Sequence, residues 1–203
     1  MPINVPNQIT LLRLVLAIVF FAVMGQYSQR QPRSWLLDIG LVTFVIAAAT
    51  DYLDGYYARK HNQVTSLGRI LDPFVDKVLV CGAFIFLAGP GFCGDDGENA
   101  TGLRPWMVVV VLGRELLVTG LRGFSESRGV AYGAEFIGKA KMWVQSITVG
   151  ALLLIVARYG SNGPQAAVII KTLFVWLTVV VTSASLVTYL MKSRGLLLEA
   201  HQA

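Results

Sequence analysis

The chain has 203 residues, of which 55% are hydrophobic and 14% are charged. Soluble domains carry roughly a quarter charged residues, so this composition excludes an ordinary soluble domain and indicates an integral membrane protein. The net charge of +5 does not require nucleic acid as a partner, because basic residues beside membrane spans set topology and attract anionic lipid headgroups.

The length suits one all-α membrane domain over residues 1–203 with about six spans of roughly 20 residues each. No signal peptide is expected, because the first residues lack a basic segment and no cleavage site follows the first apolar run. Neither a repeat nor a domain boundary is evident. The expected spans are residues 9–24, 35–57, 67–88, 105–121, 136–157 and 166–191.

The first span begins after Pro6, and we expect Asn7 to be its N-cap. Asn7, Thr10 and Arg13 follow one another at three-residue intervals, close to one helical face. Two interpretations remain open for this face. Arg13 either extends towards the headgroups or belongs to a polar surface that faces a functional site.

The second and third spans carry four aspartates where they approach each other in sequence. Asp51 and Asp54 are three residues apart, and Asp72 and Asp76 are four apart, so each pair shares a helical face. The polar stretch 60–66 suits a connection between antiparallel helices, which would bring the four carboxylates together. Such a cluster repels itself without cations, and hard divalent ions with oxygen ligands, Mg²⁺ or Mn²⁺, are the natural occupants.

Small and basic residues accompany the aspartates. Gly55 and Ala58 leave a shallow helix face where a ligand can approach the backbone. Arg59 offers a planar guanidinium for phosphate, and Gly68 opens the third span. Carboxylates next to a bilayer are costly, so the segment is predicted to be a functional site.

The spacing of these eight residues over positions 51–76 resembles the signature of the CDP-alcohol phosphotransferases. That resemblance implies a metal-dependent membrane enzyme, working as a homodimer, that uses CDP-diacylglycerol. It implies a site with two ions, Mg²⁺ or Mn²⁺, held by Asp51, Asp54, Asp72 and Asp76, with Asp76 as the catalytic base. It further implies a CDP-diacylglycerol site formed by Asn7, Asp54, Gly55, Ala58, Arg59 and Gly68.

A second group, of basic residues, lies near the ends of the fourth and fifth spans: Arg114, Arg122, Lys139 and Lys141. Arg114 is two turns inside its span, where a purely topological charge is costly. Glu115 is adjacent in sequence but is expected to point to another face. A phosphate on the substrate is therefore the expected partner of Arg114.

The fourth and fifth spans are similar to those of the phosphatidylglycerophosphate synthases, within the same family. The similarity rests on Gly113-Arg114-Glu115, Leu121-Arg122 and Gly138-Lys139-x-Lys141, and it departs at Gly123 and Met142. It implies transfer of the phosphatidyl group from CDP-diacylglycerol to sn-glycerol 3-phosphate, giving phosphatidylglycerol phosphate and CMP in phospholipid biosynthesis. The four basic residues would hold the acceptor phosphate.

Other readings remain. The same reaction with inositol phosphate, serine or phosphatidylglycerol as acceptor keeps the fold, although the basic group disfavours serine. A membrane prenyltransferase also binds pyrophosphate through metal, but its aspartate motifs lack the Gly-x2-Ala-Arg arrangement. A divalent-cation transporter would place its ionisable residues near mid-span, whereas here they lie at one end.

Basic residues predict the topology. Twelve of them fall on the side of the aspartates and five on the other, which predicts that both termini and the active site face the cytoplasm, in a bacterial inner membrane. The acidic loop 89–104 falls outside and is expected to be solvated. The twelve are Arg13, Arg59, Lys60, Arg69, Lys77, Arg114, Arg122, Arg128, Lys139, Lys141, Lys192 and Arg194.

Overall fold

A computed structural model describes residues 5–61, 66–128 and 136–200. Within its helices, side chains are described except at positions 5–7, 9, 51–61, 66–73, 76, 126, 136, 137, 139 and 193–200. The described part is all helical apart from its connections, and one short 3₁₀ turn, η1 (Pro90–Phe92), lies between α3 and α4.

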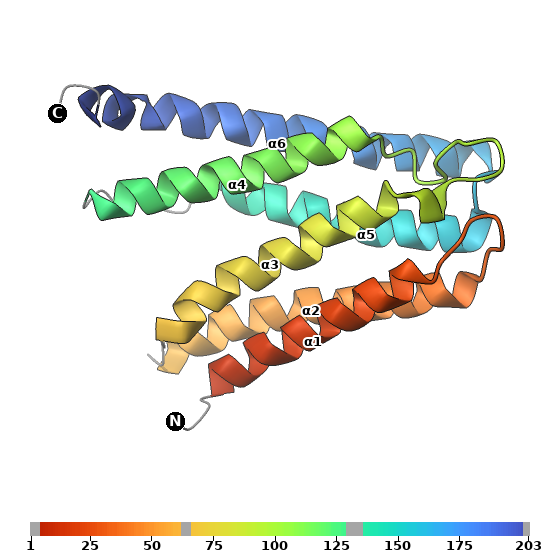
Figure 1. The fold of residues 1–203 in the computed structure, drawn as a ribbon, viewed down its shortest axis with the longest axis horizontal. Helices are drawn as coiled ribbons and strands as arrows, with labels where there is room; N and C mark the ends of the chain where they lie inside the picture. Colours follow the sequence, from red (N-terminus) through yellow and green to blue (C-terminus); the bar gives the residue numbers. More distant parts are fainter. Residues whose placement is uncertain (1–4, 62–65, 129–135, 201–203) are drawn as a thin grey trace.

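Six α-helices run back and forth along the long axis of the molecule, so that both ends of the chain lie at the same end of the bundle (Figure 1). The six predicted helices are confirmed in number and order within the described residues. Their bounds are α1 Val5–Gly25, α2 Ser34–His61, α3 Ser66–Leu87, α4 Pro105–Ser127, α5 Phe136–Tyr159 and α6 Gln165–Ala200.

The predicted N-cap is wrong, and two helices extend beyond their predicted spans. α1 begins at Val5, so Asn7 is inside the helix and is not its N-cap, and Pro6 occupies the first turn, where no amide partner is lost. α4 continues to Ser127 instead of ending at Leu121, and the Ser125 hydroxyl donates to the Leu121 carbonyl at 2.8 Å. α6 runs on to Ala200, beyond the predicted span 166–191, because the sequence after Lys192 is rich in strong helix formers.

The helices pack into one core. α1 packs on α2 and α3, α2 packs on α5, and α5 packs on α6, which also contacts α4. Phe20, Phe44 and Phe84 are buried at the α1–α2–α3 contacts, and Leu152 and Leu153 are buried from α5. α6 therefore contacts both α4 and α5, which is the arrangement on which the polar site below depends.

The outer faces of the bundle are apolar. Ile18, Val42, Val109 and Val180 are each more than half exposed, an extent of exposed apolar surface that a soluble monomer avoids. Two helical stretches among the described residues, Ala140–Tyr159 and Gln165–Lys192, are long and apolar enough to span a bilayer, and the apolar stretches of α1, α2 and α3 are shorter. These features are those of a membrane protein.

The loop between α3 and α4 closes the end of the bundle that is far from the termini (Figure 1). Asn99 donates to the Leu87 carbonyl at 3.0 Å, and its side-chain oxygen accepts from the Thr101 amide at 2.8 Å. Asp95, Asp96 and Glu98 are exposed, as expected for a solvated loop. The fold thus separates this closed acidic end from the end that bears the aspartate motif.

Candidate functional site

The aspartate motif lies where α2 ends and α3 begins, at the same end of the bundle as the two termini (Figure 1). Asp51 and Asp54 are in the last three turns of α2, and Asp72 and Asp76 are in the first three turns of α3. The two helix ends are separated by only four residues in sequence, 62–65. The donor set of four carboxylates is the one that hard divalent cations prefer.

For the four aspartates and six other predicted site residues, the structure describes the place in the helix backbone and nothing beyond it. Among the side chains that it does describe, no group of three or more His, Cys, Asp or Glu able to hold a metal ion is found. The predicted metal and CDP-diacylglycerol sites therefore remain predictions. The six other residues are Asn7, Gly55, Ala58, Arg59, Gly68 and Lys139.

Thr10 and Arg13, on the polar face of α1, are buried, with 2% and 1% of their surface exposed. An arginine that extended to the headgroups would leave its guanidinium accessible. The snorkelling interpretation of Arg13 is therefore wrong, and the interpretation as a polar surface that faces a functional site stays a prediction.

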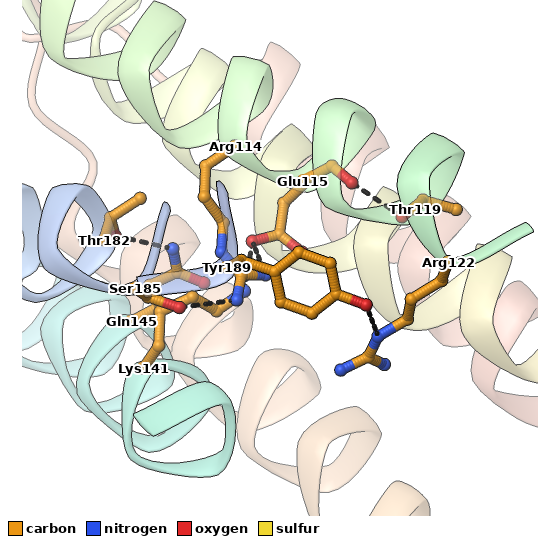
Figure 2. A network of polar contacts seen from close by, with 9 residues as sticks. All are labelled: Arg114, Glu115, Thr119, Arg122, Lys141, Gln145, Thr182, Ser185 and Tyr189. Atoms are coloured by element: carbon orange, nitrogen blue, oxygen red, sulfur yellow. Dashed lines mark hydrogen bonds and ion pairs between the residues drawn. The ribbon is translucent and has the colours of Figure 1, made fainter. Parts of the chain in front are cut away.

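The basic residues Arg114 and Lys141, from α4 and α5, meet inside the bundle at Glu115. Their exposed fractions are 6% for Arg114, 5% for Lys141 and 7% for Glu115. One carboxylate oxygen of Glu115, Oε1, accepts from Arg114 Nη1 at 3.3 Å and from Lys141 Nζ (Figure 2). Two predicted acceptor-site cations thus share one buried anion, and we name these three residues the ion cluster.

The prediction that Glu115 points away from Arg114 is wrong. Consecutive helical residues do diverge by about 100°, as the sequence argument assumed. The long arginine side chain nevertheless carries its guanidinium to the carboxylate, and both side chains face α5 and α6 (Figure 2). In the apolar interior an unpaired charge is costly, which gives a physical reason for this convergence.

α6 is the third helix that contributes a side chain to the site. Ser185 Oγ accepts from Arg114 Nη2 at 2.6 Å, so the guanidinium is held at two of its three nitrogens. The remaining nitrogen, Nε, is buried and has no hydrogen-bond partner among the described residues. A buried N–H without a partner is costly, and here it belongs to a group that is already positively charged.

Arg122 lies two turns further along α4 and interacts with Tyr189 of α6 (Figure 2). Its Nε donates to the tyrosine hydroxyl at 3.3 Å, and its guanidinium carbon lies 5.6 Å from the centre of the tyrosine ring. Tyr189 is buried whereas Arg122 is only partly so. Arg122 is thereby positioned between the ion cluster and the end of α4.

A row of polar side chains continues from the ion cluster along the contact of α5 and α6. Gln145 donates to Thr182 at 3.1 Å, and the hydroxyls of Thr148 and Thr178 are 2.8 Å apart. Interhelical hydrogen bonds of this kind hold helices together where water is absent. We read this row as the element that fixes α6, with Ser185 and Tyr189, against α5.

Arg114, Arg122 and Lys141 were predicted from the sequence as acceptor-site residues, and the structure brings Arg114 and Lys141 together at Glu115. Ser185, Tyr189 and Gln145 were not predicted from the sequence. One signal was present: Gln145 and Thr148 follow Lys141 at the intervals of a single helical face. No comparable signal marks Ser185 or Tyr189 as partners of α4, because their role depends on how α6 packs.

Comparison with known proteins shows which family this chain belongs to. A family model described as CDP-alcohol phosphatidyltransferase matches residues 3–184. The CDP-diacylglycerol–glycerol-3-phosphate 3-phosphatidyltransferase of Bacillus subtilis is 40% identical over 164 residues, covering 74% of this chain and 77% of the relative.

Two further relatives have consistent names. A probable phosphatidylglycerophosphate synthase of Mycobacterium tuberculosis is 34% identical over 87% of this chain and 77% of its own length. A CDP-diacylglycerol–glycerol-3-phosphate 3-phosphatidyltransferase of Rickettsia bellii is 32% identical over 79% of this chain and 77% of its own length. With the family model matching nine-tenths of its length, this chain belongs to the CDP-alcohol phosphatidyltransferase family.

Proposed function

We propose that the protein transfers the phosphatidyl group of CDP-diacylglycerol to sn-glycerol 3-phosphate, giving phosphatidylglycerol phosphate and CMP. The names of its relatives support this reaction. The observation that carries the choice of acceptor is the ion cluster with its neighbour Arg122. Its two buried cations share one carboxylate, so the described site has a surplus of positive charge that suits a phosphorylated acceptor.

In this reaction a free hydroxyl of the acceptor attacks the lipid-bearing phosphorus of CDP-diacylglycerol. The bond from that phosphorus to the oxygen bridging to CMP breaks, and CMP leaves. We assign Asp76 as the base that takes the hydroxyl proton.

We assign Asp51, Asp54 and Asp72, together with Asp76, as the residues that would hold two divalent ions, Mg²⁺ or Mn²⁺. When bound, such ions would neutralise the pyrophosphate and stabilise the leaving CMP. The carboxylate donor set at adjacent ends of α2 and α3 is what supports this assignment. Aspartates alone would repel the doubly anionic diphosphate.

The nucleotide end of CDP-diacylglycerol is assigned to the same helix ends. Gly55 and Ala58 leave room beside α2, Gly68 does so at the start of α3, and Arg59 and Asn7 supply polar contacts. The acyl chains remain in the bilayer while the headgroup reaches the end of the bundle. A site at the end of the helices is thus accessible to a lipid and to a water-soluble acceptor.

The acceptor phosphate is assigned to Arg114, Arg122, Lys139 and Lys141. Arg122 and Lys141 lie near the ends of α4 and α5 that face the aspartate-bearing end of the bundle (Figure 1). An inositol phosphate would satisfy the same basic residues and is the second candidate acceptor. Serine carries no phosphate for them to bind.

We further propose that all six helices cross a bacterial cytoplasmic membrane and that the active site faces the cytoplasm. The distribution of basic residues supports this orientation. A homodimer is also proposed, on the family resemblance alone.

The test is release of CMP by purified protein in detergent, with CDP-diacylglycerol, Mg²⁺ and one acceptor at a time. We expect release with glycerol 3-phosphate and none with serine, inositol phosphate or phosphatidylglycerol. The Asp76→Asn variant is expected to lose at least about a hundredfold in kcat, since a positioned base contributes about that much or more.

Controls distinguish the failure modes of this test. Removal of divalent ions by a chelator is expected to abolish release, and added Mg²⁺ or Mn²⁺ to restore it. Release with inositol phosphate alone would keep the reaction type and overturn the acceptor. Absence of release with every acceptor, from protein that unfolds cooperatively on heating, would overturn the proposed function.

A further inference from the structure

Charge is unevenly distributed in the ion cluster. Arg114 and Lys141 are cations, and Glu115 is the one carboxylate within the described residues that pairs with them. Both bonds use the same oxygen, Oε1. The carboxylate therefore links α4 to α5 through a single atom, and one positive charge of the pair is not compensated there.

The linkage also orients the arginine. Glu115 and Ser185 hold the two terminal nitrogens of Arg114, which leaves the guanidinium no free rotation. Its Nε is buried without a hydrogen-bond partner among the described residues. A fixed guanidinium that keeps an unused donor is prepared to bind a further anion.

Because the acceptor is already assigned to these cations, the following inference rests on the proposed function. We propose that Glu115 is a positioning residue for the acceptor phosphate. It holds Lys141 and Arg114 in one fixed relation, so that both cations are in place before glycerol 3-phosphate arrives. It does not touch the substrate itself and acts through the two cations.

A purely structural salt bridge is the main alternative. A buried ion pair is weak support for stability, because apolar residues of similar volume often replace it without loss. Loss of a structural pair would alter folding and would change the use of both substrates alike. Loss of a positioning residue would change one substrate's KM and leave the other unchanged.

The experiment measures initial rates for Glu115→Gln and Glu115→Ala, varying each substrate while the other is saturating. We expect the KM for glycerol 3-phosphate to rise about ten- to a hundredfold, the range of one hydrogen bond to a charged group. The KM for CDP-diacylglycerol is expected to change by less than about twofold. Asp38→Asn is the matched control, because Asp38 pairs at 2.9 Å with Arg158 in a partly exposed ion pair outside the ion cluster.

A double variant tests whether Glu115 acts through Lys141. In a Lys141→Met background, Glu115→Gln is expected to have a clearly smaller effect on kcat/KM for glycerol 3-phosphate than in the wild type, since one of the two ionic contacts of Glu115 is already gone. Full additivity of the two changes would overturn the proposal. Thermal unfolding in detergent, with Glu115→Gln as the nearly isosteric change, separates loss of fold from loss of positioning.

Two other results would also overturn it. A lower KM for glycerol 3-phosphate in Glu115→Gln would mean that the carboxylate competes with the phosphate for the cations. Equal changes in both KM values, with a lower unfolding temperature, would mean a structural role. If the wild type releases no CMP with glycerol 3-phosphate, the proposed function fails first, and that outcome is visible without any variant.

Discussion

Arg122 depends on a tyrosine from another helix for its position. The Tyr189 hydroxyl accepts from Arg122 Nε, and the ring lies within 5.6 Å of the guanidinium. A cation above an aromatic ring is attracted to its face. The hydrogen bond to the hydroxyl also orients the guanidinium, which the ring alone does not do. Unlike Arg114, Arg122 has no carboxylate partner among the described residues.

Tyr189→Phe keeps the ring and removes the hydroxyl. We expect the KM for glycerol 3-phosphate to rise about two- to tenfold, because a long, partly exposed hydrogen bond contributes about 0.5–1.5 kcal/mol. The KM for CDP-diacylglycerol should stay the same. Initial-rate kinetics check this, with Tyr189→Leu, which loses ring and hydroxyl, expected to show the larger rise.

An unchanged KM in Tyr189→Phe, together with a raised KM in Tyr189→Leu, would assign the whole contribution to the ring. An unchanged KM in both variants would remove Arg122 from the acceptor site.

At the level of single residues, the sequence predicts the cations but not their partners. Arg114 was identifiable because an arginine deep in an apolar run requires an anion. The anion was then assigned to the substrate alone, whereas the structure provides Glu115. The arginine side chain is long enough to contact Glu115 although the two residues leave the helix in different directions. Helical periodicity gives the direction of a side chain but not the distance that it spans.

At the level of helices, the packing of α1 on α3 depends on a glycine. Gly82 of α3 faces Phe21 of α1, and a β-carbon at position 82 would overlap the Phe21 ring. That ring is stacked on Phe86, with ring centres 5.6 Å apart and planes 13° apart. The missing side chain thus allows α3, which carries Asp72 and Asp76, to approach α1 closely.

Gly82→Ala is expected to destabilise the protein by about 1–3 kcal/mol, the usual cost of overpacking a close contact. The apparent unfolding temperature in detergent should fall by several degrees, at about 2–4 °C per kcal/mol. Gly120→Ala is the control, because a β-carbon added at position 120 of α4 would have no described atom within 4 Å beyond its own helix backbone and chain neighbours. That variant should unfold at the same or a higher temperature, since alanine favours helix.

A Gly82→Ala protein as stable as the wild type would mean that Phe21 moves aside freely and that this close contact does not hold α3. Activity measured in parallel shows whether a shift of α3 reaches the aspartate motif.

The helices themselves were predictable because each is a long apolar run bounded by polar residues. Their ends were not, as α4 and α6 show. Both extend well beyond the apolar run, to Ser127 and Ala200. Hydropathy detects where an apolar run ends, but it does not detect where the helix itself ends.

Over the whole molecule, the described part of the chain has six α-helices that run back and forth, so the start of α1, the end of α2, the start of α3 and the ends of α4 and α6 lie at one end of the bundle (Figure 1). The acidic loop between α3 and α4 is at the other end. Sequence predicted this separation from the count of spans. The proposed direction across the membrane is supported by the excess of basic residues alone.

Cysteine labelling tests that direction. In a variant with Cys81→Ala and Cys93→Ser, one cysteine is introduced at Asp95 in the exposed loop or at Ser127 at the end of α4, both exposed positions. In intact spheroplasts, a membrane-impermeant maleimide is expected to label Asp95→Cys at once and to label Ser127→Cys only after lysis, because the two positions lie at opposite ends of the bundle. The reverse pattern would put the active site outside the cytoplasm, where a cytosolic acceptor such as glycerol 3-phosphate is absent. Labelling of both positions only after lysis would mean that the bundle does not cross the bilayer from end to end, and the proposal of six spans would fail with it.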